Sequence, residues 1–135
     1  MKILLDTHVI IWVLTDDSAL SAKAREAISD TKNTIYYSLA SIWEIAIKNA
    51  RNPSACPYNE KEIADYCGKS GFLSLDISLK HITELRNLKI KPGRESSNSD
   101  PFDRILIAQA KAENMKLFSH DTNFANYDEK CISRI

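Results

Sequence analysis

The pattern of apolar residues starts with a short run, Ile3, Leu4 and Leu5, which ends at Asp6. The run is far too short to cross a membrane, and it is too continuous for a strand with one face in water. A strand that is apolar on both faces is typical of the middle of a parallel sheet that helices cover on both sides. Asp6 is then expected at the carboxyl end of the strand, the edge at which open α/β sheets bind their ligands.

The rest of the pattern predicts an alternation of strands and helices. The predicted strands span residues 1–6, 33–38, 72–75, 116–119 and 131–133, and the predicted helices span residues 8–14, 21–29, 39–49, 59–69, 78–88 and 100–110. Such an alternation indicates a parallel sheet with right-handed crossovers in a single α/β domain. Two segments that contain proline, 52–57 and 89–99, are predicted to be loops.

Composition narrows the class of protein. The 135 residues contain 18 basic and 18 acidic side chains, so the formal net charge is zero and any site for a polyanion must be a local patch. The three cysteines lack metal-like spacing, fit a reducing compartment and are expected to be incidental thiols. The N-terminus has no pattern of a secretion signal, and no segment is long enough to span a bilayer. We therefore expect a soluble, cytoplasmic protein without membrane contact.

Four acidic residues are placed where the predicted fold can bring them together. Asp6 and Asp121 each follow a strand. Asp103 lies in the first turn of a predicted helix, and Glu44 lies in an otherwise apolar stretch of another. Two carboxylates about 5 Å apart would repel each other by roughly 3 kcal/mol at an effective dielectric constant near 20. A divalent cation would remove that repulsion, and oxygen ligands without His or Cys favour Mg²⁺ or Mn²⁺ over Zn²⁺.

Each of these residues also has an ordinary structural explanation. Asp6 and Asp121 could cap the segments that follow them, and Glu44 could extend to solvent from its helix. Asp103 could belong to a capping arrangement behind Asp100, where free amides and the helix dipole favour a carboxylate. Taken singly, none of the four residues decides between structure and chemistry.

Taken together, four segments resemble one family. LLDTH at 4–8, SIWEIAIK at 41–48, DPFDRILIAQA at 100–110 and SHDTNF at 119–124 are similar to motifs of PIN domains, and more narrowly of VapC-type toxins from bacterial toxin–antitoxin pairs. The resemblance implies a three-layer α/β/α sandwich whose parallel sheet has strand order 3-2-1-4-5. It also implies an Mg²⁺- or Mn²⁺-dependent endoribonuclease whose acidic residues are Asp6, Glu44, Asp103 and Asp121.

The resemblance further implies partners, and it exposes two departures near the site, besides a loop at 52–57 that differs from the Gly-containing turn expected there. Toxins of this type are neutralised by a small antitoxin whose tail covers the active-site groove, and they commonly form homodimers. Residues 96–99 are polar where relatives often have His or Lys, and His120 stands where a basic residue is common. Neither departure touches the acidic residues, but both could alter how RNA is held.

The mechanism that this interpretation implies divides the acidic residues by role. Asp6, Asp103 and Asp121 are expected to coordinate the cation, directly or through water. Glu44 is expected to be either an outer ligand or the base that accepts a proton from the attacking water. Replacement of Asp6 by Asn is therefore expected to abolish metal-dependent RNA cleavage and to leave the fold intact.

Neighbouring residues are predicted to assist at the site. Thr7 or Ser119 could hydrogen-bond a carboxylate or the phosphate. Arg104 could contact phosphate or form a salt bridge on the helix surface. Two groups of basic side chains could form the walls of an RNA groove or could simply be solvated. These groups are Lys48 with Arg51, and Lys89 with Lys91 and Arg94.

Four other conspicuous residues are assigned no part in the chemistry. Asp76 is predicted to be the N-cap of the helix after its strand, and His120 is predicted to pack beside the site. Trp12 and Trp43 are predicted to lie in the core or to face a partner. The rival function is a catalytically silent PIN-like module that binds RNA or protein, and RNA cleavage that chelation abolishes would distinguish the two.

Overall fold

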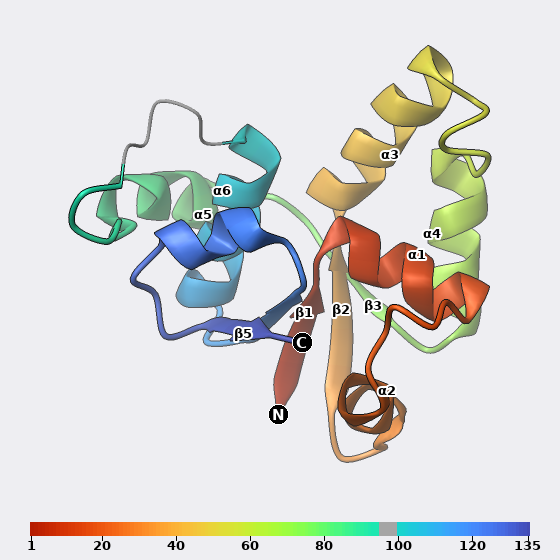
Figure 1. Cartoon of the computed structure of the whole chain (residues 1–135), viewed down its shortest axis with the longest axis horizontal. Helices are drawn as coiled ribbons and strands as arrows, with labels where there is room; N and C mark the ends of the chain where they lie inside the picture. The colour runs from red at the N-terminus through yellow and green to blue at the C-terminus, as the bar shows by residue number, and fades with distance from the viewer. Residues whose placement is uncertain (95–99) are drawn as a thin grey trace.

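A computed structural model describes residues 1–94 and 100–135 and contains one five-stranded sheet, in the order β3-β2-β1-β4-β5 (Figure 1). All four neighbouring pairs are parallel. The strands are β1 (Lys2–Leu5), β2 (Thr34–Ser38), β3 (Leu73–Leu75), β4 (Lys116–Ser119) and β5 (Ile132–Arg134). The predicted strand order is confirmed, and β1 is the central strand.

The continuous apolar run in β1 is explained by two separate core clusters. Ile3 and Leu5 face a cluster on one side of the sheet, whereas Leu4 faces a second cluster on the other side. All three side chains are fully buried. Because successive side chains of a strand point to opposite faces, an unbroken apolar sequence is what a doubly covered strand requires.

Helices cover both faces of the sheet, as the three-layer prediction requires (Figure 1). One face is covered by α1 (Thr7–Thr15), α2 (Ala22–Ser29) and α4 (Glu60–Lys69), and the other by α6 (Pro101–Ala112), against which α5 (Leu79–Glu84) packs. The helix α3 (Leu39–Arg51) rises from the carboxyl end of β2 and contributes residues to both clusters. Two 3₁₀ helices, η1 (Leu85–Asn87) and η2 (Thr122–Asn126), complete the described elements.

Local sequence signals explain where several helices begin. Ser21 caps α2 by accepting a hydrogen bond from the backbone N–H of Ala24. Asn59 and Glu62 form a capping box at the start of α4. Asp100 caps α6, and Pro101 occupies the first helical position, where its missing N–H costs nothing.

Two predictions about the segment after β3 are wrong. The helix predicted over residues 78–88 is divided into α5 and the 3₁₀ helix η1. The N-cap of α5 is Ser78 rather than Asp76. The backbone N–H of Ser78 is bonded by Nδ1 of His81, a side chain within the first turn, and this contact sets the start of the helix. The last strand also lies one residue later than predicted.

Cys56, Cys67 and Cys131 are free thiols, and burial raises the pKa of Cys67 to about 12. A thiol that stays protonated at neutral pH is a poor nucleophile, so Cys67 acts as a core side chain. Among the described residues, no helix has both the length and the apolar character needed to cross a membrane.

Candidate active site at the carboxyl edge of the sheet

Asp6 lies where β1 ends and α1 begins, and it is almost completely buried. Its Oδ1 accepts a hydrogen bond from the backbone N–H of Thr7 at 2.7 Å, so it does act as a helix cap. Its Oδ2 accepts a hydrogen bond from Oγ of Ser119 at 2.9 Å, which joins β1 to β4. Burial raises the pKa of Asp6 despite these two donors and the nearby His8.

Glu44 projects from α3 and is 8% exposed, so the prediction that it could simply extend to solvent is wrong. Its Oε1 lies 2.7 Å from Oγ1 of Thr7, and its Oε2 lies 2.8 Å from Nζ of Lys48, one turn further along the helix. Thr7 Oγ1 also lies 2.9 Å from Oγ of Ser41. Because a hydroxyl has a single proton, Thr7 donates to Glu44 and accepts from Ser41.

Asp103 has the most perturbed acidity of the four residues. It lies in the first turn of α6 behind the N-cap Asp100 and is 8% exposed. Burial, followed by repulsion from Asp100, Asp6, Asp121 and Glu44, raises its pKa to about 8. Among the residues that the structure describes, no side chain or backbone N–H donates a hydrogen bond to its carboxylate. A free carboxylate here therefore holds a proton at neutral pH unless a cation compensates its charge.

Asp121 follows β4 and is only partly buried. Its Oδ1 caps η2 by accepting from the N–H of Asn123 at 2.9 Å, as the capping alternative predicted. Its own N–H donates to Oγ of Ser119 at 3.1 Å. Ser119 therefore contacts both Asp121 and Asp6, and it aligns the ends of two neighbouring strands.

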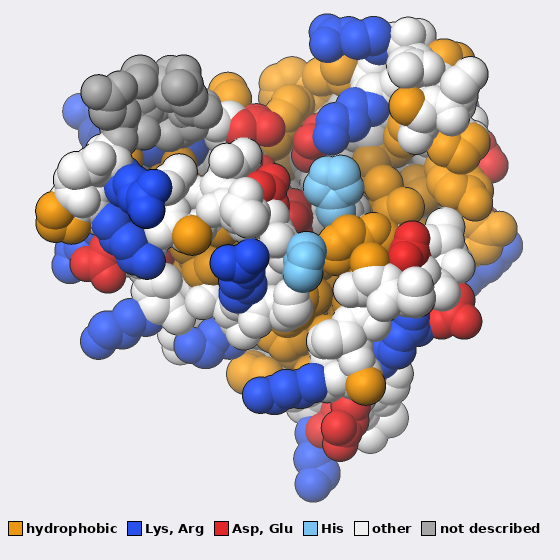
Figure 2. Space-filling model, in the orientation of Figure 1, with side chains coloured by type: hydrophobic (Ala, Val, Ile, Leu, Met, Phe, Trp, Pro, Cys, Tyr) orange, Lys and Arg blue, Asp and Glu red, His pale blue; other side chains and the backbone are white. Residues whose placement is uncertain are grey.

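The fold brings the four predicted carboxylates to one edge of the sheet. Figure 2 shows acidic side chains gathered in the hollow between the two sides of the molecule, with basic and histidine side chains beside them. Thr7 and Ser119, both predicted to assist, lie between the carboxylates and contact them directly. Capping and clustering are thus compatible, because a carboxylate that caps a helix with one oxygen can face the cluster with the other.

This arrangement suits a hydrated cation better than a tightly enclosed one. Across residues 1–94 and 100–135, no three acidic, His or Cys side chains already converge closely enough to enclose an ion. Mg²⁺ keeps several of its waters in proteins and is commonly held by one or two carboxylates. The donors at this edge are carboxylate oxygens that repel one another, and Asp103 lacks a compensating donor among the described residues. The residues present therefore fit Mg²⁺ or Mn²⁺.

The predicted basic side chains are distributed unevenly around this edge. Lys48 is paired with Glu44; burial lowers its pKa, but the Glu44 contact and the fields of Asp100 and Asp6 raise it more. Arg104 donates to the backbone oxygen of Leu85 at 3.1 Å and, within the described residues, forms no ion pair, so its predicted surface salt bridge is absent.

A cavity of about 400 Å³ adjoins the acidic edge. Its lining includes Asp121 and Ser119 from the β4 end, together with Lys91 and Arg134. Lys91 belongs to one of the two basic groups predicted to contact RNA, whereas the departure predicted at 96–99 lies outside the described residues. This cavity therefore places basic side chains beside one of the four carboxylates.

The aromatic residues near the site differ in their packing and exposure. His120 packs edge-on against Trp12, with ring centroids 5.5 Å apart, and its Nδ1 lies 2.6 Å from the backbone oxygen of Ile135. The predicted packing of His120 is confirmed, and Trp12 lies against the core. Trp43 is 60% exposed and meets Phe102 edge-on at 5.0 Å, so it is not a core residue.

Two contributors were missed by sequence reasoning. Among the neighbouring carboxylates, Asp100 raises the pKa of Asp103 the most, although the sequence indicates only a helix cap at this position. Ser41 supports Glu44 through Thr7. Each lies three residues before the carboxylate it affects, and residues three apart on a helix are neighbours. That spacing could have identified both.

Comparison with known proteins identifies the fold family. The family model of the PIN domain matches residues 3–130. The structure is similar to VapBC2 from Rickettsia felis bound to a promoter DNA fragment, with a TM-score of 0.71 and 15% identity over 99% of this chain and 98% of that one. It is also similar to DNA-bound VapBC from Salmonella typhimurium, with a TM-score of 0.68 and 18% identity over the same shares of the two chains.

A third similar structure is a toxin–antitoxin complex from Klebsiella pneumoniae, with a TM-score of 0.60 and 20% identity over 96% of this chain and 94% of that one. Among curated proteins, none matches the chain significantly by sequence. At these identities the solved structures support the fold, and the family match covers nearly the whole chain. The chain therefore belongs to the PIN domain family.

Proposed function

We propose that this chain is a metal-dependent endoribonuclease that acts as the toxin of a toxin–antitoxin pair. The observation that supports this most strongly is the gathering of four carboxylates, Asp6, Glu44, Asp103 and Asp121, at one edge of the sheet, with the first three buried. Burial and the repulsion of neighbouring carboxylates raise the pKa of Asp103 to about 8, and perturbed acidities cluster at functional sites. A divalent cation at this edge would be bound by the same carboxylates and would offset their mutual repulsion.

The proposed cation ligands are Asp6, Asp103 and Asp121, directly or through water, with Glu44 as an outer ligand or as the base. When bound, Mg²⁺ or Mn²⁺ supplies a positive charge that lowers the pKa of water and offsets charge on phosphoryl oxygens. The chain's own groups then hold the acidic residues in position.

Glu44 is suited to proton transfer because both of its oxygens are oriented. Oε1 accepts from Thr7, and Oε2 is held by Lys48 at 2.8 Å. In the proposed mechanism, Oε2 accepts a proton from the attacking water, and Lys48 offsets the negative charge of the carboxylate until that transfer. Ser119 keeps Asp6 in a fixed orientation through its 2.9 Å hydrogen bond.

RNA is the proposed substrate, and its backbone would approach the acidic edge across basic side chains. Lys91 and Arg134 line the cavity next to Asp121, which supports a phosphate contact on that side. Lys48 and Arg51 lie on α3 at the other side of the edge. Neutralising side chains that contact phosphates should weaken RNA binding and flatten its dependence on salt.

The proposed protein partner is a small antitoxin, and a homodimer is the proposed assembly. Solved structures that resemble this chain over nearly its full length are described as VapBC bound to DNA or as a toxin–antitoxin complex. The proposal transfers that partnership to this chain, and co-purification with the product of a neighbouring reading frame would test it. Light scattering of the isolated chain would test the dimer.

The proposed activity is tested by incubating the protein with a panel of RNAs in Mg²⁺, in Mn²⁺ and in a chelator. We expect cleavage with either metal and none with the chelator. Asp6→Asn should reduce cleavage by more than the roughly 10–100-fold loss that is typical when an outer-shell partner is removed. The matched control is Asp76→Asn, because Asp76 also follows a strand of the sheet but is exposed.

Two results would contradict the proposal. One is a correctly folded Asp6→Asn variant that cleaves RNA as fast as the wild type. The other is a wild-type protein that binds RNA or an antitoxin but cleaves nothing in the panel with either metal. That second result would favour the catalytically silent binding module instead.

A further inference from the structure

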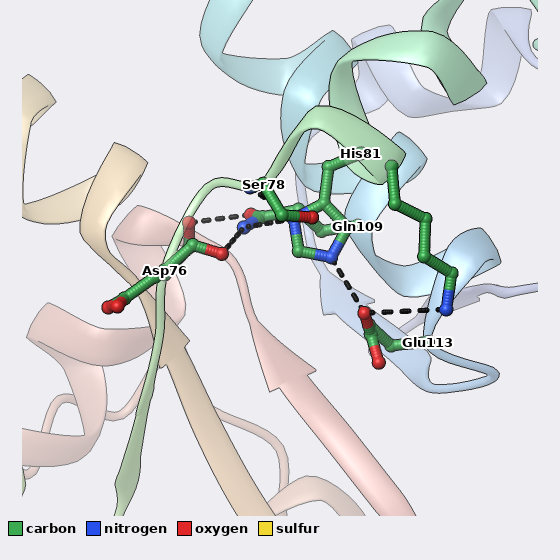
Figure 3. A network of polar contacts seen from close by, with 7 residues as sticks. Asp76, Ser78, His81, Gln109 and Glu113 are labelled. Carbon is green, nitrogen blue, oxygen red and sulfur yellow. Dashed lines mark hydrogen bonds and ion pairs between the residues drawn. The ribbon is translucent and has the colours of Figure 1, made fainter.

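Gln109 is a buried polar residue outside the acidic edge, and it lies on α6, the helix that carries Asp103. Its Oε1 accepts a hydrogen bond from Oγ of Ser38 at 2.6 Å, and its Nε2 donates to the backbone oxygen of Asp76 at 3.3 Å. Figure 3 shows this amide at the centre of a polar network with Ser78, His81 and Glu113. Gln109 therefore joins α6 to the ends of two different strands.

The contact with Ser38 is also a contact with the start of α3. Ser38 is the last residue of β2 and the N-cap of α3, where its Oγ accepts the N–H of Ala40 at 3.0 Å. Within residues 1–94 and 100–135, the Ser38–Gln109 bond is the only side-chain hydrogen bond that joins the β2–α3 segment to α6. The helices that carry Glu44 and Asp103 thus share one polar link.

We infer that Gln109 is a positioning residue that sets the orientation of α3 relative to α6 and thereby the separation of Glu44 and Asp103. Glu44 lies six residues after Ser38, and Asp103 lies six residues before Gln109. Six helical residues span about 9 Å, so each carboxylate lies at a similar distance along its helix from the link. A change of angle at the link would therefore displace both carboxylates. The benefit for metal binding rests on the proposed function, whereas the link itself does not.

A second contact connects the same helices near the carboxylates. Trp43 precedes Glu44, Phe102 precedes Asp103, and the two rings meet edge-on at 5.0 Å. This aromatic contact is exposed on the Trp43 side and allows sliding, whereas the buried hydrogen bond fixes direction and distance. We therefore assign the orientation to Gln109 rather than to the aromatic pair.

His81 determines which way the amide of Gln109 points. Nδ1 of His81 accepts the backbone N–H of Ser78 at 3.1 Å, so this nitrogen has no proton, and Nε2 donates to Oε1 of Glu113 at 2.8 Å. Nδ1 also lies 3.4 Å from Nε2 of Gln109, so it faces the amide nitrogen rather than the amide oxygen. This arrangement directs Oε1 of Gln109 toward Ser38.

The test compares Gln109→Met, which keeps a side chain of similar length but loses both hydrogen bonds, with Lys111→Met on the same helix. Lys111→Met loses the ion pairs with Glu129 and Glu84, and within the described residues no hydrogen bond or ion pair of Lys111 involves Gln109 or α3, so this variant controls for lost stability. Residual dipolar couplings of the metal-free proteins report the angle between α3 and α6. An EPR titration with Mn²⁺ reports the affinity for the metal.

We expect Gln109→Met to change the α3–α6 angle and to weaken Mn²⁺ binding by about 10–100-fold, as outer-shell changes commonly do. Lys111→Met should leave both unchanged. If Gln109→Met does not fold, Gln109→Leu also removes both hydrogen bonds, leaves the Ser38 cap of α3 intact and should change the angle in the same way.

An unchanged angle in the variant that folds would overturn the inference, even if the wild type cleaves RNA. A changed angle in a protein whose wild type binds no Mn²⁺ would instead contradict the proposed function and leave the link established. The angle therefore decides the role of Gln109, and the metal titration decides whether that role serves a metal site.

Discussion

Two groups of polar side chains in this protein differ in how the free-energy cost of their burial is compensated. The network around His81, Gln109 and Glu113 pairs each donor with an acceptor, and Lys80 lies 3.7 Å from the carboxylate of Glu113 (Figure 3). The acidic edge brings like charges together, and Asp103 has no donor among the described residues. Both groups use α6, which carries Asp103 near its start and Gln109 and Glu113 at its end.

This difference distinguishes polar groups that stabilise the fold by themselves from polar groups that we expect to serve a function. A buried polar group costs free energy unless it is hydrogen-bonded, and a buried charge costs much more unless it is paired. The His81 network meets that requirement internally and needs no ligand to be stable. The acidic edge meets it only in part, through Thr7, Ser119 and Lys48. Its remaining charge would be offset by the cation that we propose to bind there.

The largest expected effect on stability comes from Asp103. Its pKa rises from 3.8 in the unfolded chain to about 8 in the folded chain, so the folded state holds this proton more tightly. The resulting contribution is fully present below pH 3.8 and is lost as the pH rises through about 8. Over that interval, the free energy of unfolding of the metal-free protein should fall by up to about 1.4 kcal/mol per pH unit because of this group.

Asp103→Asn should remove that slope. In chelator at pH 8 the variant should be more stable than the wild type, and the advantage should shrink as the pH approaches 4, as measured by urea unfolding. Millimolar Mn²⁺ should stabilise the wild type more than the variant, because only the wild type has the full set of ligands. Parallel pH profiles in chelator would show that the carboxyl of Asp103 ionises normally and that the acidic edge is not electrostatically strained.

The network around His81, Gln109 and Glu113 should contribute to stability with the opposite dependence on pH. The hydrogen bond from His81, supported by the charge of Lys80, lowers the pKa of Glu113 below its ordinary value of 4.5. A lowered pKa stabilises the folded state above pH 4.5, and this contribution is lost as the pH falls through the folded value. His81→Ala should cost about 1–3 kcal/mol in urea unfolding at neutral pH, because it removes a buried side chain together with its hydrogen bonds to Ser78 and Glu113.

Glu113→Gln is the control for this network. Its amide oxygen still accepts from Nε2 of His81, so most of the stability should remain, but the loss of stability on acidification should become smaller. Metal affinity should be unchanged in Glu113→Gln, because this variant keeps the His81 ring that orients the amide of Gln109. A variant at Glu113 that loses as much stability as His81→Ala would indicate a charged imidazole rather than a neutral one.

The fold was largely predictable from the sequence, because β1 has apolar residues on both faces and the helices have clear caps at Ser21, Asn59 and Asp100. The start of α5 was not, because it depends on a contact between the Ser78 backbone and the His81 ring, which no local propensity encodes. Segment boundaries set by side-chain contacts of this kind are the least predictable from sequence.

The gathering of the acidic residues was predictable from the sequence but their energetics were not, and their catalytic role stays a prediction. The motifs around Asp6, Glu44, Asp103 and Asp121 predicted which carboxylates share an edge. The sequence does not show that the pKa of Asp103 is raised the most or that Asp100 is the carboxylate that repels it most. Both facts depend on burial and on distances in the folded structure. The position of Gln109 within the motif at 100–110 does not reveal its role, because its partner Ser38 is 71 residues away in the chain.

The smallest expected effect concerns Lys48, which connects the acidic edge to the outer surface of α3. Its Nζ lies 2.8 Å from Glu44 Oε2, but about half of its side chain is exposed, so water screens the pair. Lys48→Met should change the free energy of unfolding by at most about 1 kcal/mol, because exposed pairs contribute little. The rate of RNA cleavage should decline by more than this small change in stability would explain, because Glu44 would lose the ammonium group of Lys48 that holds its Oε2. Lys69→Met is the matched control, because Lys69 forms an exposed ion pair with Asp65 at the same i,i+4 spacing on α4, and equal cleavage by the two variants would show that Lys48 has no part in orienting Glu44.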